Sequence, residues 1–227
     1  MNKNGQPWAS FGQMDTGKSY EQLKIAEYYR KRELSPKRTI IYDWNNNDKT
    51  YGGIKPIEID DLDFALPKRA LVKVQHWDTA EFIKKCHFLR NSVIIFDDAT
   101  AKFKNWFPKD MEKLCYQAKN WNLEIMFQFH TIRSAPPAIL DVIQMYIIKA
   151  TRDKLPLKDS FAEPETIENL ILDCKAENRN YPESQQWATR ILDLGNETIW
   201  TKNVKEIDFV KSYTQKQKID DYLNSNK

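Results

Sequence analysis

The chain has few of the residues that mark several large classes of protein. Only six glycines, three cysteines and three histidines occur among its 227 residues. The cysteines, at positions 86, 115 and 174, are far apart, so their spacing predicts neither a disulfide framework nor a zinc site and favours a reducing, intracellular compartment. No apolar run reaches membrane-spanning length, and the first residues lack the apolar core of a signal peptide. We therefore expect a soluble chain without membrane insertion.

Charge and length set further bounds. The formal net charge is +3, from 35 lysines and arginines against 32 acidic residues. Basic residues cluster at 30–32 and 37–38, but so close a balance does not by itself indicate a nucleic-acid partner. A chain of this length can bury one sizeable core, with or without an appendage.

Two of the six glycines stand in a phosphate-binding motif near the N-terminus, the Walker A pattern. It reads Gly12, Gln13, Met14, Asp15, Thr16, Gly17, Lys18, Ser19, followed by Tyr20. The glycines let backbone N–H groups point at phosphate oxygens, Lys18 adds positive charge, and Ser19 offers a hydroxyl to Mg²⁺. Tyr20 continues into a helical stretch whose positive end faces the phosphates. These features predict a site for ATP and Mg²⁺ that includes all nine residues.

The alternative interpretation of this motif is a chance match in a surface turn. From average residue usage, such a pattern arises in a chain of this length about once in a hundred tries. The context also favours a nucleotide site, because residues 7–11 have the composition of a short strand and the motif requires a strand, a loop and a helix in that order.

Apolar runs alternate with helical patterns along the first 150 residues. Candidate strands lie at 7–11, 39–42, 70–74, 92–96, 123–129 and 145–150, and candidate helices at 20–29, 79–89, 110–120 and 137–143. This alternation predicts an α/β fold, a P-loop NTPase core over residues 1–153 whose mostly parallel sheet carries helices on both faces.

The character of the sequence changes after Thr151. A helix is expected at 164–176, and two strand-like runs flank Gly195 and Asn196 as a hairpin, before a polar tail. We therefore predict a small C-terminal appendage of helix and hairpin over residues 154–227, packed on the core or extending from it.

The apolar run at residues 92–96 ends in two carboxylates, Asp97 and Asp98. A continuous apolar run predicts a central strand, and doubly wound sheets bind ligands at the carboxyl ends of their strands. The pattern is typical of a Walker B motif, in which Asp97 holds Mg²⁺ with Ser19 and Asp98 orients or deprotonates the attacking water. The alternative is an acidic helix cap at a strand-to-helix turn, which the phosphate motif makes the weaker interpretation.

Two polar residues, Gln128 and His130, lie at the tip of the strand predicted at 123–129. In many ATPases a polar side chain in this place contacts the γ-phosphate or the lytic water. We favour His130, because strand alternation and its final position bring it nearer the phosphate loop. A histidine that caps the strand for structural reasons is an equally good interpretation.

Over residues 7–153 the arrangement resembles the FtsK–HerA superfamily of DNA-pumping ATPases. The resemblance rests on the early phosphate loop, on Tyr42 and Asp43 at the end of a strand, on the two acids at 97–98, and on the segment 127–137. Its small size and lack of a membrane segment make the chain most similar to the genome-packaging ATPases of membrane-containing icosahedral viruses and their poxvirus-type relatives. Asp98 stands where many members have glutamate, and His130 where the sensor glutamine is expected.

The resemblance implies a ring of copies of this chain, expected to be a hexamer, that uses ATP hydrolysis to move double-stranded DNA. It also implies a capsid or membrane-vertex protein as a partner, and a place in the host cytoplasm or on the virion. An arginine finger that reaches the neighbouring subunit's γ-phosphate is implied as well. Arg133 and Arg152 follow core strands and are the candidates, with an ordinary surface arginine as the alternative for each.

The loop after the Walker B segment supplies candidate DNA contacts. Lys102 and Lys104, with the aromatic residues Phe103 and Trp106, could line a DNA channel by touching phosphates. A solvated basic loop over a packed aromatic is an equally good interpretation.

Three other functions share parts of the pattern. A filamentous-phage assembly ATPase of the zonula-occludens-toxin type has this core but usually carries a membrane segment. A small nucleotide kinase shares the loop and the size, but usually needs an arginine-rich lid, which the sequence does not indicate. A module that binds nucleotide without turning it over is the third.

Overall fold

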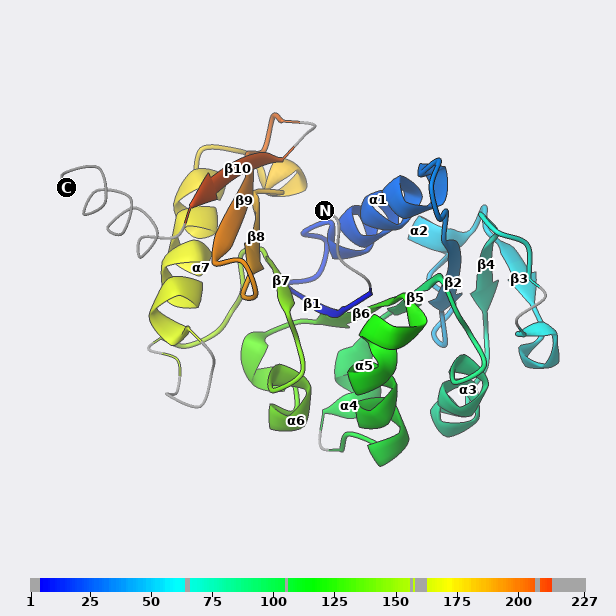
Figure 1. Ribbon diagram of the computed structural model, residues 1–227. Helices are drawn as coiled ribbons and strands as arrows, with labels where there is room; N and C mark the ends of the chain where they lie inside the picture. The colour runs from blue at the N-terminus through cyan, green and yellow to red at the C-terminus, as the bar shows by residue number, and fades with distance from the viewer. Residues whose placement is uncertain are drawn as a thin grey trace.

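The structure, a computed structural model, is built on one sheet with helices on both faces (Figure 1). It describes residues 5–63, 66–104, 106–155, 157, 163–206 and 209–213. The strands follow the order β10-β9-β8-β7-β1-β6-β5-β2-β4-β3 across the sheet. Their bounds are β1 Pro7–Phe11, β2 Arg38–Tyr42, β3 Lys55–Ile57, β4 Leu71–Val74, β5 Ser92–Phe96, β6 Leu123–Phe129, β7 Met145–Ile148, β8 Thr189–Asp193, β9 Thr198–Lys202 and β10 Val210–Tyr213.

The strands from β7 to β3 in this order all run parallel. Phe11 of β1 pairs in register with Phe129 of β6 and Ile148 of β7, and Phe96 of β5 pairs with Phe127. The carboxyl ends of these strands therefore meet at one edge of the sheet, where an open α/β sheet binds its ligand. The predicted α/β class and mostly parallel sheet are confirmed.

Helices form a layer on each face. They are α1 Lys18–Lys31, α2 Asp48–Tyr51, α3 Thr79–Cys86, α4 Ala99–Phe103, α5 Lys109–Trp121, α6 Pro137–Leu140 and α7 Pro164–Asn178, with short 3₁₀ turns η1 Ile59–Asp61, η2 Ile132–Ser134 and η3 Glu183–Gln185. In Figure 1, α1 and α2 lie on one side of the sheet and α3 to α6 on the other. The helix expected at 137–143 is shorter because the chain must turn after Leu140 to enter β7 at Met145.

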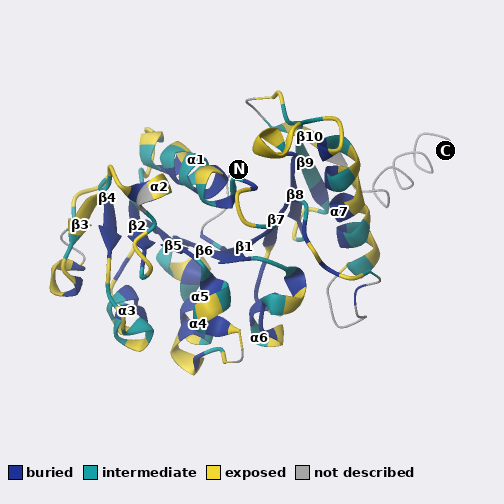
Figure 2. Ribbon diagram, turned by 180° about the vertical axis from the view of Figure 1, so that it is seen from behind, coloured by how far each residue is buried: buried dark blue, intermediate teal, exposed yellow. Residues whose placement is uncertain are grey.

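Strand alternation divides the core between the two faces. Ile40 and Tyr42 of β2 belong to the core on the face covered by α3 to α7, whereas Ile41 belongs to the core on the face covered by α1 and α2. Both faces of the central strands are covered, and Figure 2 shows these strands buried along their length. This explains why the sequence carries continuous apolar runs there rather than alternating ones.

The C-terminal segment continues the same sheet. β8 pairs antiparallel with β7, β9 with β8, and β10 with β9. The hairpin expected around Gly195 and Asn196 joins β8 to β9, and α7 packs on β7 and β8. The tail expected beyond Tyr213 lies outside the described residues.

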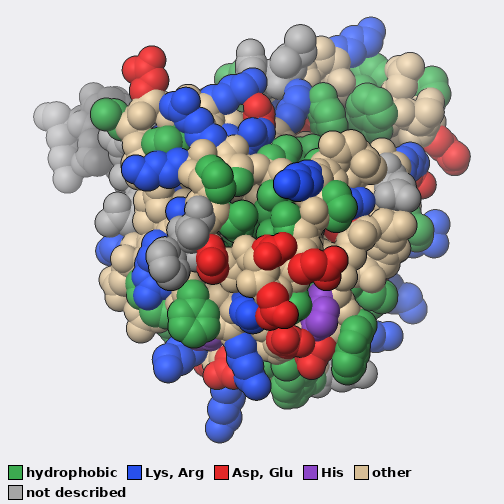
Figure 3. All heavy atoms as spheres, turned by 90° about the vertical axis from the view of Figure 1, so that its right-hand side faces the viewer, with side chains coloured by type: hydrophobic (Ala, Val, Ile, Leu, Met, Phe, Trp, Pro, Cys, Tyr) green, Lys and Arg blue, Asp and Glu red, His purple; other side chains and the backbone are tan. Residues whose placement is uncertain are grey.

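The opposite edge of the sheet is β3, a strand that the sequence did not indicate. Its proline, Pro56, cannot donate to a further strand, which discourages pairing with another sheet. Figure 3 shows the face that carries this edge, where acidic side chains gather with a histidine beside them. Ion pairs join Lys85 to Asp60 at 2.8 Å and His76 to Glu81 at 2.8 Å. In the described part of the chain, no helix combines the length and apolar character needed to cross a membrane.

Candidate active site

The phosphate loop is anchored between two neighbouring strands. The N–H of Gly12 donates to the carbonyl of Phe129 at 3.2 Å, and that of Gln13 donates to the carbonyl of Ala150 at 3.0 Å. Gly17 has a φ of 77°, in the left-handed region that favours glycine, and α1 begins directly after it. A Cβ atom at Gly12 would lie 2.7 Å from Thr16 Oγ1, so the loop has no room for a larger residue there.

Lys18 lies at the centre of this loop. Its Nζ donates to the carbonyl oxygens of Gly12 at 2.8 Å and Gln13 at 2.7 Å. Burial lowers the pKa of Lys18 to about 8, against the opposing attraction of Asp97 and Asp98. A positive charge beside bent backbone N–H groups suits a polyphosphate.

Ser19 brings the loop to the carboxyl ends of β5 and β6. Its Oγ lies 3.2 Å from Asp97 Oδ1 and 3.0 Å from Gln128 Oε1. Burial raises the pKa of Asp97, and hydrogen bonds from Asn47, Tyr51 and Ser19 oppose the rise. A hydroxyl and a carboxylate side by side are oxygen ligands of the kind that Mg²⁺ takes.

Two residues that the sequence did not indicate complete the surroundings of Asp97. Asn47 Nδ2 donates to its Oδ2 at 3.3 Å, and the Tyr51 hydroxyl donates to its Oδ1 at 3.2 Å. Asp43, at the end of β2, accepts the backbone N–H of Asn47 at 2.7 Å and so orders the loop that presents these groups. The polar run at 43–48, after a buried strand, was the only sequence signal for Asn47, and no local pattern indicated Tyr51.

Gln128 and His130 take different places. Phe127 and Phe129 pack on the α5 face, so Gln128 points to the α1 face, where its Nε2 donates to Gln22 Oε1 at 2.9 Å. The structure thus puts Gln128, rather than the favoured His130, beside Ser19. His130 lies beyond the end of β6, with its Nε2 3.3 Å from Asp98 Oδ1.

Asp98 precedes α4 with a left-handed backbone, φ 43°. It occupies the N-cap position, yet its side chain makes no capping hydrogen bond. The carboxylate instead lines the cavity that Lys18 and His130 also line. The capping alternative therefore does not describe what this side chain does.

One cavity of about 1340 Å³ connects these groups. It runs from Asp97, Asp98, Gln128 and His130, past the phosphate loop, to the C-terminal segment at 183–187 and 202–206. Among the loop residues, Met14 and Tyr20 are exposed, and Asp15 forms an exposed ion pair with Lys49 at 2.6 Å.

The remaining predicted residues lie outside this cavity. Arg133 and Arg152 are exposed at the carboxyl ends of β6 and β7, and Arg133 donates to the carbonyl of Lys154. Lys102 donates to the Trp77 carbonyl at 3.1 Å, whereas Lys104 is exposed.

The aromatic part of the proposed DNA loop needs correction. Phe103 is fully buried and packs edge-on against Phe96 and Phe127, so it cannot line a channel. Trp106 is exposed. Phe103 lies on the apolar side of α4 and packs in the core, whereas Lys104 and Trp106 face solvent.

No family model matches the sequence, and no curated protein sequence matches it significantly. Solved structures do match. The genome-packaging NTPase B204 from Sulfolobus turreted icosahedral virus 2, in complex with ATP-γS, is 17% identical, with a TM-score of 0.59 over 90% of this chain and 100% of that one. The chain has the fold of a viral genome-packaging NTPase.

Two further matches belong beside it. The DNA-packaging ATPase B204 from Sulfolobus turreted icosahedral virus is 16% identical, with a TM-score of 0.61 over 92% of this chain and 100% of that one. The N-terminal domain of zonular occludens toxin from Neisseria meningitidis is 11% identical, with a TM-score of 0.44 over 96% of this chain and 97% of that one. The two B204 matches confirm the α/β P-loop NTPase fold that the sequence predicts.

Proposed function

We propose that this chain hydrolyses ATP and uses the energy to move double-stranded DNA, as a viral genome-packaging motor. The observation that carries the proposal is the position of Ser19 Oγ in the phosphate loop, 3.2 Å from Asp97 Oδ1 and 3.0 Å from Gln128 Oε1. The B204 neighbours, described as a DNA-packaging ATPase and as a complex with ATP-γS, support it.

Ser19 and Asp97 would hold Mg²⁺. Among the residues that the structure describes, no group of three or more His, Cys, Asp or Glu side chains gathers as a metal site. Mg²⁺ commonly uses one or two protein ligands and completes its shell with water and substrate phosphates. Ser19 and Asp97 provide this number of ligands, and the ion would neutralise charge on the β- and γ-phosphates.

The chain's own residues divide the hydrolysis between them. Lys18 holds the β- and γ-phosphates, which stabilises the charge that develops in phosphoryl transfer. Asp98 orients the attacking water and takes its proton as the oxygen bonds to the γ-phosphorus and the bond to the β-phosphate oxygen breaks. His130, 3.3 Å from Asp98, positions that carboxylate.

The wider assembly follows from the same proposal. Copies of the chain form a ring, expected to be a hexamer, in which Arg133 or Arg152 reaches the neighbouring nucleotide. Lys104, with Lys102, contacts DNA phosphates. A capsid or membrane-vertex protein receives the motor, in the host cytoplasm or on the virion.

Phosphate release with and without duplex DNA tests the proposal, together with mass in solution by light scattering in ATP and DNA. We expect hydrolysis that DNA stimulates, and a mass several times that of the chain. No release under either condition would support a module that only binds nucleotide. Transfer of phosphate to a nucleotide by a monomer would support a kinase.

A further inference from the structure

The cavity extends well beyond the phosphate loop, on the side away from the carboxylates. In the sheet, β1 and the phosphate loop that follows it have β6 and β5 on one side and β7 and β8 on the other. Gln128 lies on β6, and Asp97 follows β5. The catalytic groups mark the γ-phosphate end, so the nucleoside must lie toward β7 and β8. There the cavity is lined by Trp187, Lys202 and residues 204–206.

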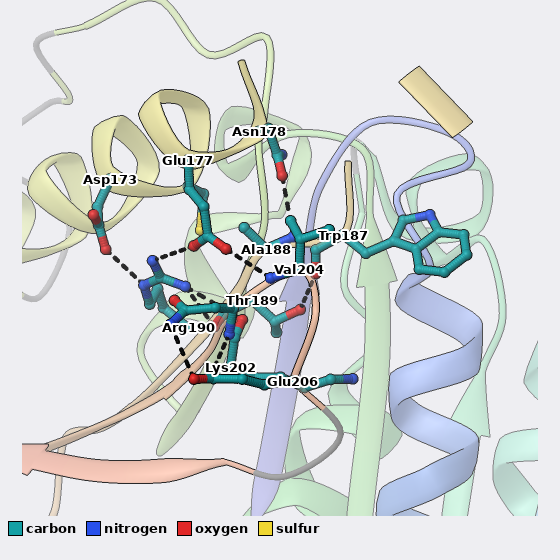
Figure 4. Close-up of polar contacts among 12 residues, drawn as sticks. Asp173, Glu177, Asn178, Trp187, Ala188, Thr189, Arg190, Lys202, Val204 and Glu206 are labelled. Atoms are coloured by element: carbon teal, nitrogen blue, oxygen red, sulfur yellow. Dashed lines mark hydrogen bonds and ion pairs between the residues drawn. The ribbon is translucent and has the colours of Figure 1, made fainter. Parts of the chain in front are cut away.

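Trp187 presents an indole to this end of the cavity. The residue is 46% exposed, although its indole lies against the loop: a Cβ atom on Gly17 would be 3.9 Å from Trp187 Cδ1. Figure 4 shows the indole projecting away from the polar contacts behind it, toward the blue N-terminal segment that holds the loop and α1. Tyr20, also exposed, lines the same cavity from α1.

Hydrogen bonds from buried residues fix the backbone around Trp187. Its carbonyl accepts from Lys149 Nζ at 3.5 Å and from Thr189 Oγ1 at 2.8 Å, and Lys149 is fully buried behind the loop. The next residue, Ala188, donates its N–H to Asn178 of α7 at 3.1 Å. The indole is therefore presented from a rigid support rather than from a free loop.

The second wall, residues 202–206, is held by the same helix (Figure 4). Glu177 of α7 accepts the N–H of Val204 at 2.6 Å and bonds Arg190 at 2.8 Å. Lys202 reaches across the cavity to Glu21 in the first turn of α1, and both side chains are buried. This contact ties the C-terminal segment to the helix that follows the phosphate loop.

We propose that the base of the bound nucleoside triphosphate stacks on the Trp187 indole, in a subsite that residues 183–206 add to the phosphate loop. The inference rests on the proposed function. An exposed indole with a π-face beside the phosphate site provides stacking that tolerates different bases. The C-terminal extension of the sheet is thus part of the nucleotide site.

Calorimetry with two ligands tests the subsite. The adenosine β,γ-methylene triphosphate and inorganic tripolyphosphate, each with Mg²⁺, are titrated into the natural chain and into Trp187→Ala, Trp187→Phe and Tyr116→Ala. Tyr116 is a matched control, since it is an exposed aromatic residue on α5 that does not line the cavity.

Trp187→Ala should bind the adenosine analogue about tenfold more weakly and tripolyphosphate as the natural chain does. Trp187→Phe should keep most of the affinity, and Tyr116→Ala all of it. Equal losses for both ligands, or no loss, would overturn the subsite while leaving the proposed function standing. A natural chain that binds neither ligand would overturn the proposed function and the subsite with it.

A second measurement needs no variant. An ATP analogue with a photoreactive azide on its base is cross-linked to the natural chain, and the labelled peptides are identified by mass spectrometry. Label on the peptides that contain Trp187 or residues 202–206 supports the subsite. Label confined to the loop at 45–50, which lines the other end of the cavity, would overturn it.

Discussion

The hydroxyl oxygen of Ser19 lies 3.2 Å from Oδ1 of Asp97, although 78 positions separate the two residues in the sequence. The parallel register of β1, β6 and β5 produces this contact, because it brings the carboxyl ends of the three strands to one edge.

Replacing Lys18 with alanine should abolish turnover and weaken nucleotide binding. The side chain supplies the buried positive charge of the loop, and loss of one such group costs about a hundredfold or more in rate. Lys31→Ala is the control, since this exposed lysine lies at the far end of α1. Phosphate release at the natural rate from Lys18→Ala would show that the loop has no catalytic role.

Asp97→Asn and Asp98→Asn should fail in different ways. Asp98→Asn removes the base and leaves the Mg²⁺ ligands, so nucleotide binding should survive while hydrolysis falls about a hundredfold or more. Asp97→Asn should weaken Mg²⁺-dependent binding, because its carboxylate adjoins Ser19. Calorimetry and phosphate release measure both, and the reverse pattern would exchange the two roles.

Substitutions of Gln128 and of His130 should likewise have different effects. Gln128 bonds Gln22 and faces Ser19, so Gln128→Ala should raise the Mg²⁺ concentration for half-maximal activity by about tenfold. His130→Ala should lower the turnover rate at saturating Mg²⁺ without changing that concentration. Titration of activity against Mg²⁺ measures this difference, and a Mg²⁺ shift in His130→Ala alone would place the histidine, rather than Gln128, beside the ion.

DNA stimulation should depend steeply on salt and weakly on base sequence. Lys102→Ala with Lys104→Ala should reduce the slope of log affinity against log salt by about two, and leave DNA-free turnover unchanged. Lys104→Ala alone should account for about half of the change, since each phosphate contact contributes about one to the slope. An unchanged slope in the double variant would place the DNA path elsewhere.

Stability should respond to pH through Lys149. Burial lowers its pKa to about 8 from the ordinary 10.5, with Glu21 opposing the shift and Lys202 and Lys18 adding to it; Cys174 also faces the amine. Between these two values the unfolded chain keeps a proton that the folded chain has released, so the free energy of unfolding rises with pH. Relative to Lys149→Met, the natural chain should therefore gain stability from about pH 8 to about pH 10 in denaturant titrations. A constant difference would contradict the assignment.

The sequence predicted the parts of the fold that local patterns encode. Buried strands need continuous apolar runs, so β1, β2, β5 and β6 were found close to their observed bounds. The short edge strands β3 and β10 were not, because Lys55–Ile57 and Val210–Tyr213 have too few residues to show a period.

In the candidate site too, some residues could be predicted from local patterns and others could not. The phosphate loop and the two aspartates have spacings that their chemistry requires, and these could be predicted. The places of Tyr51 and Gln128 depend on contacts across distant positions, and the position of Trp187 depends on how β8 joins the sheet beside β7. No local pattern encodes such contacts. The assigned roles of the site residues stay predictions until the variants are measured.

Displacement of a third strand measures whether ATP hydrolysis by this chain moves duplex DNA. A fluorescent oligonucleotide is bound as a triplex at one end of a linear duplex, and its release is followed with the natural chain and with Lys18→Ala. Release should require hydrolysable ATP and Mg²⁺ and should be absent with Lys18→Ala. DNA-stimulated hydrolysis that leaves the third strand in place would contradict movement of DNA by this chain.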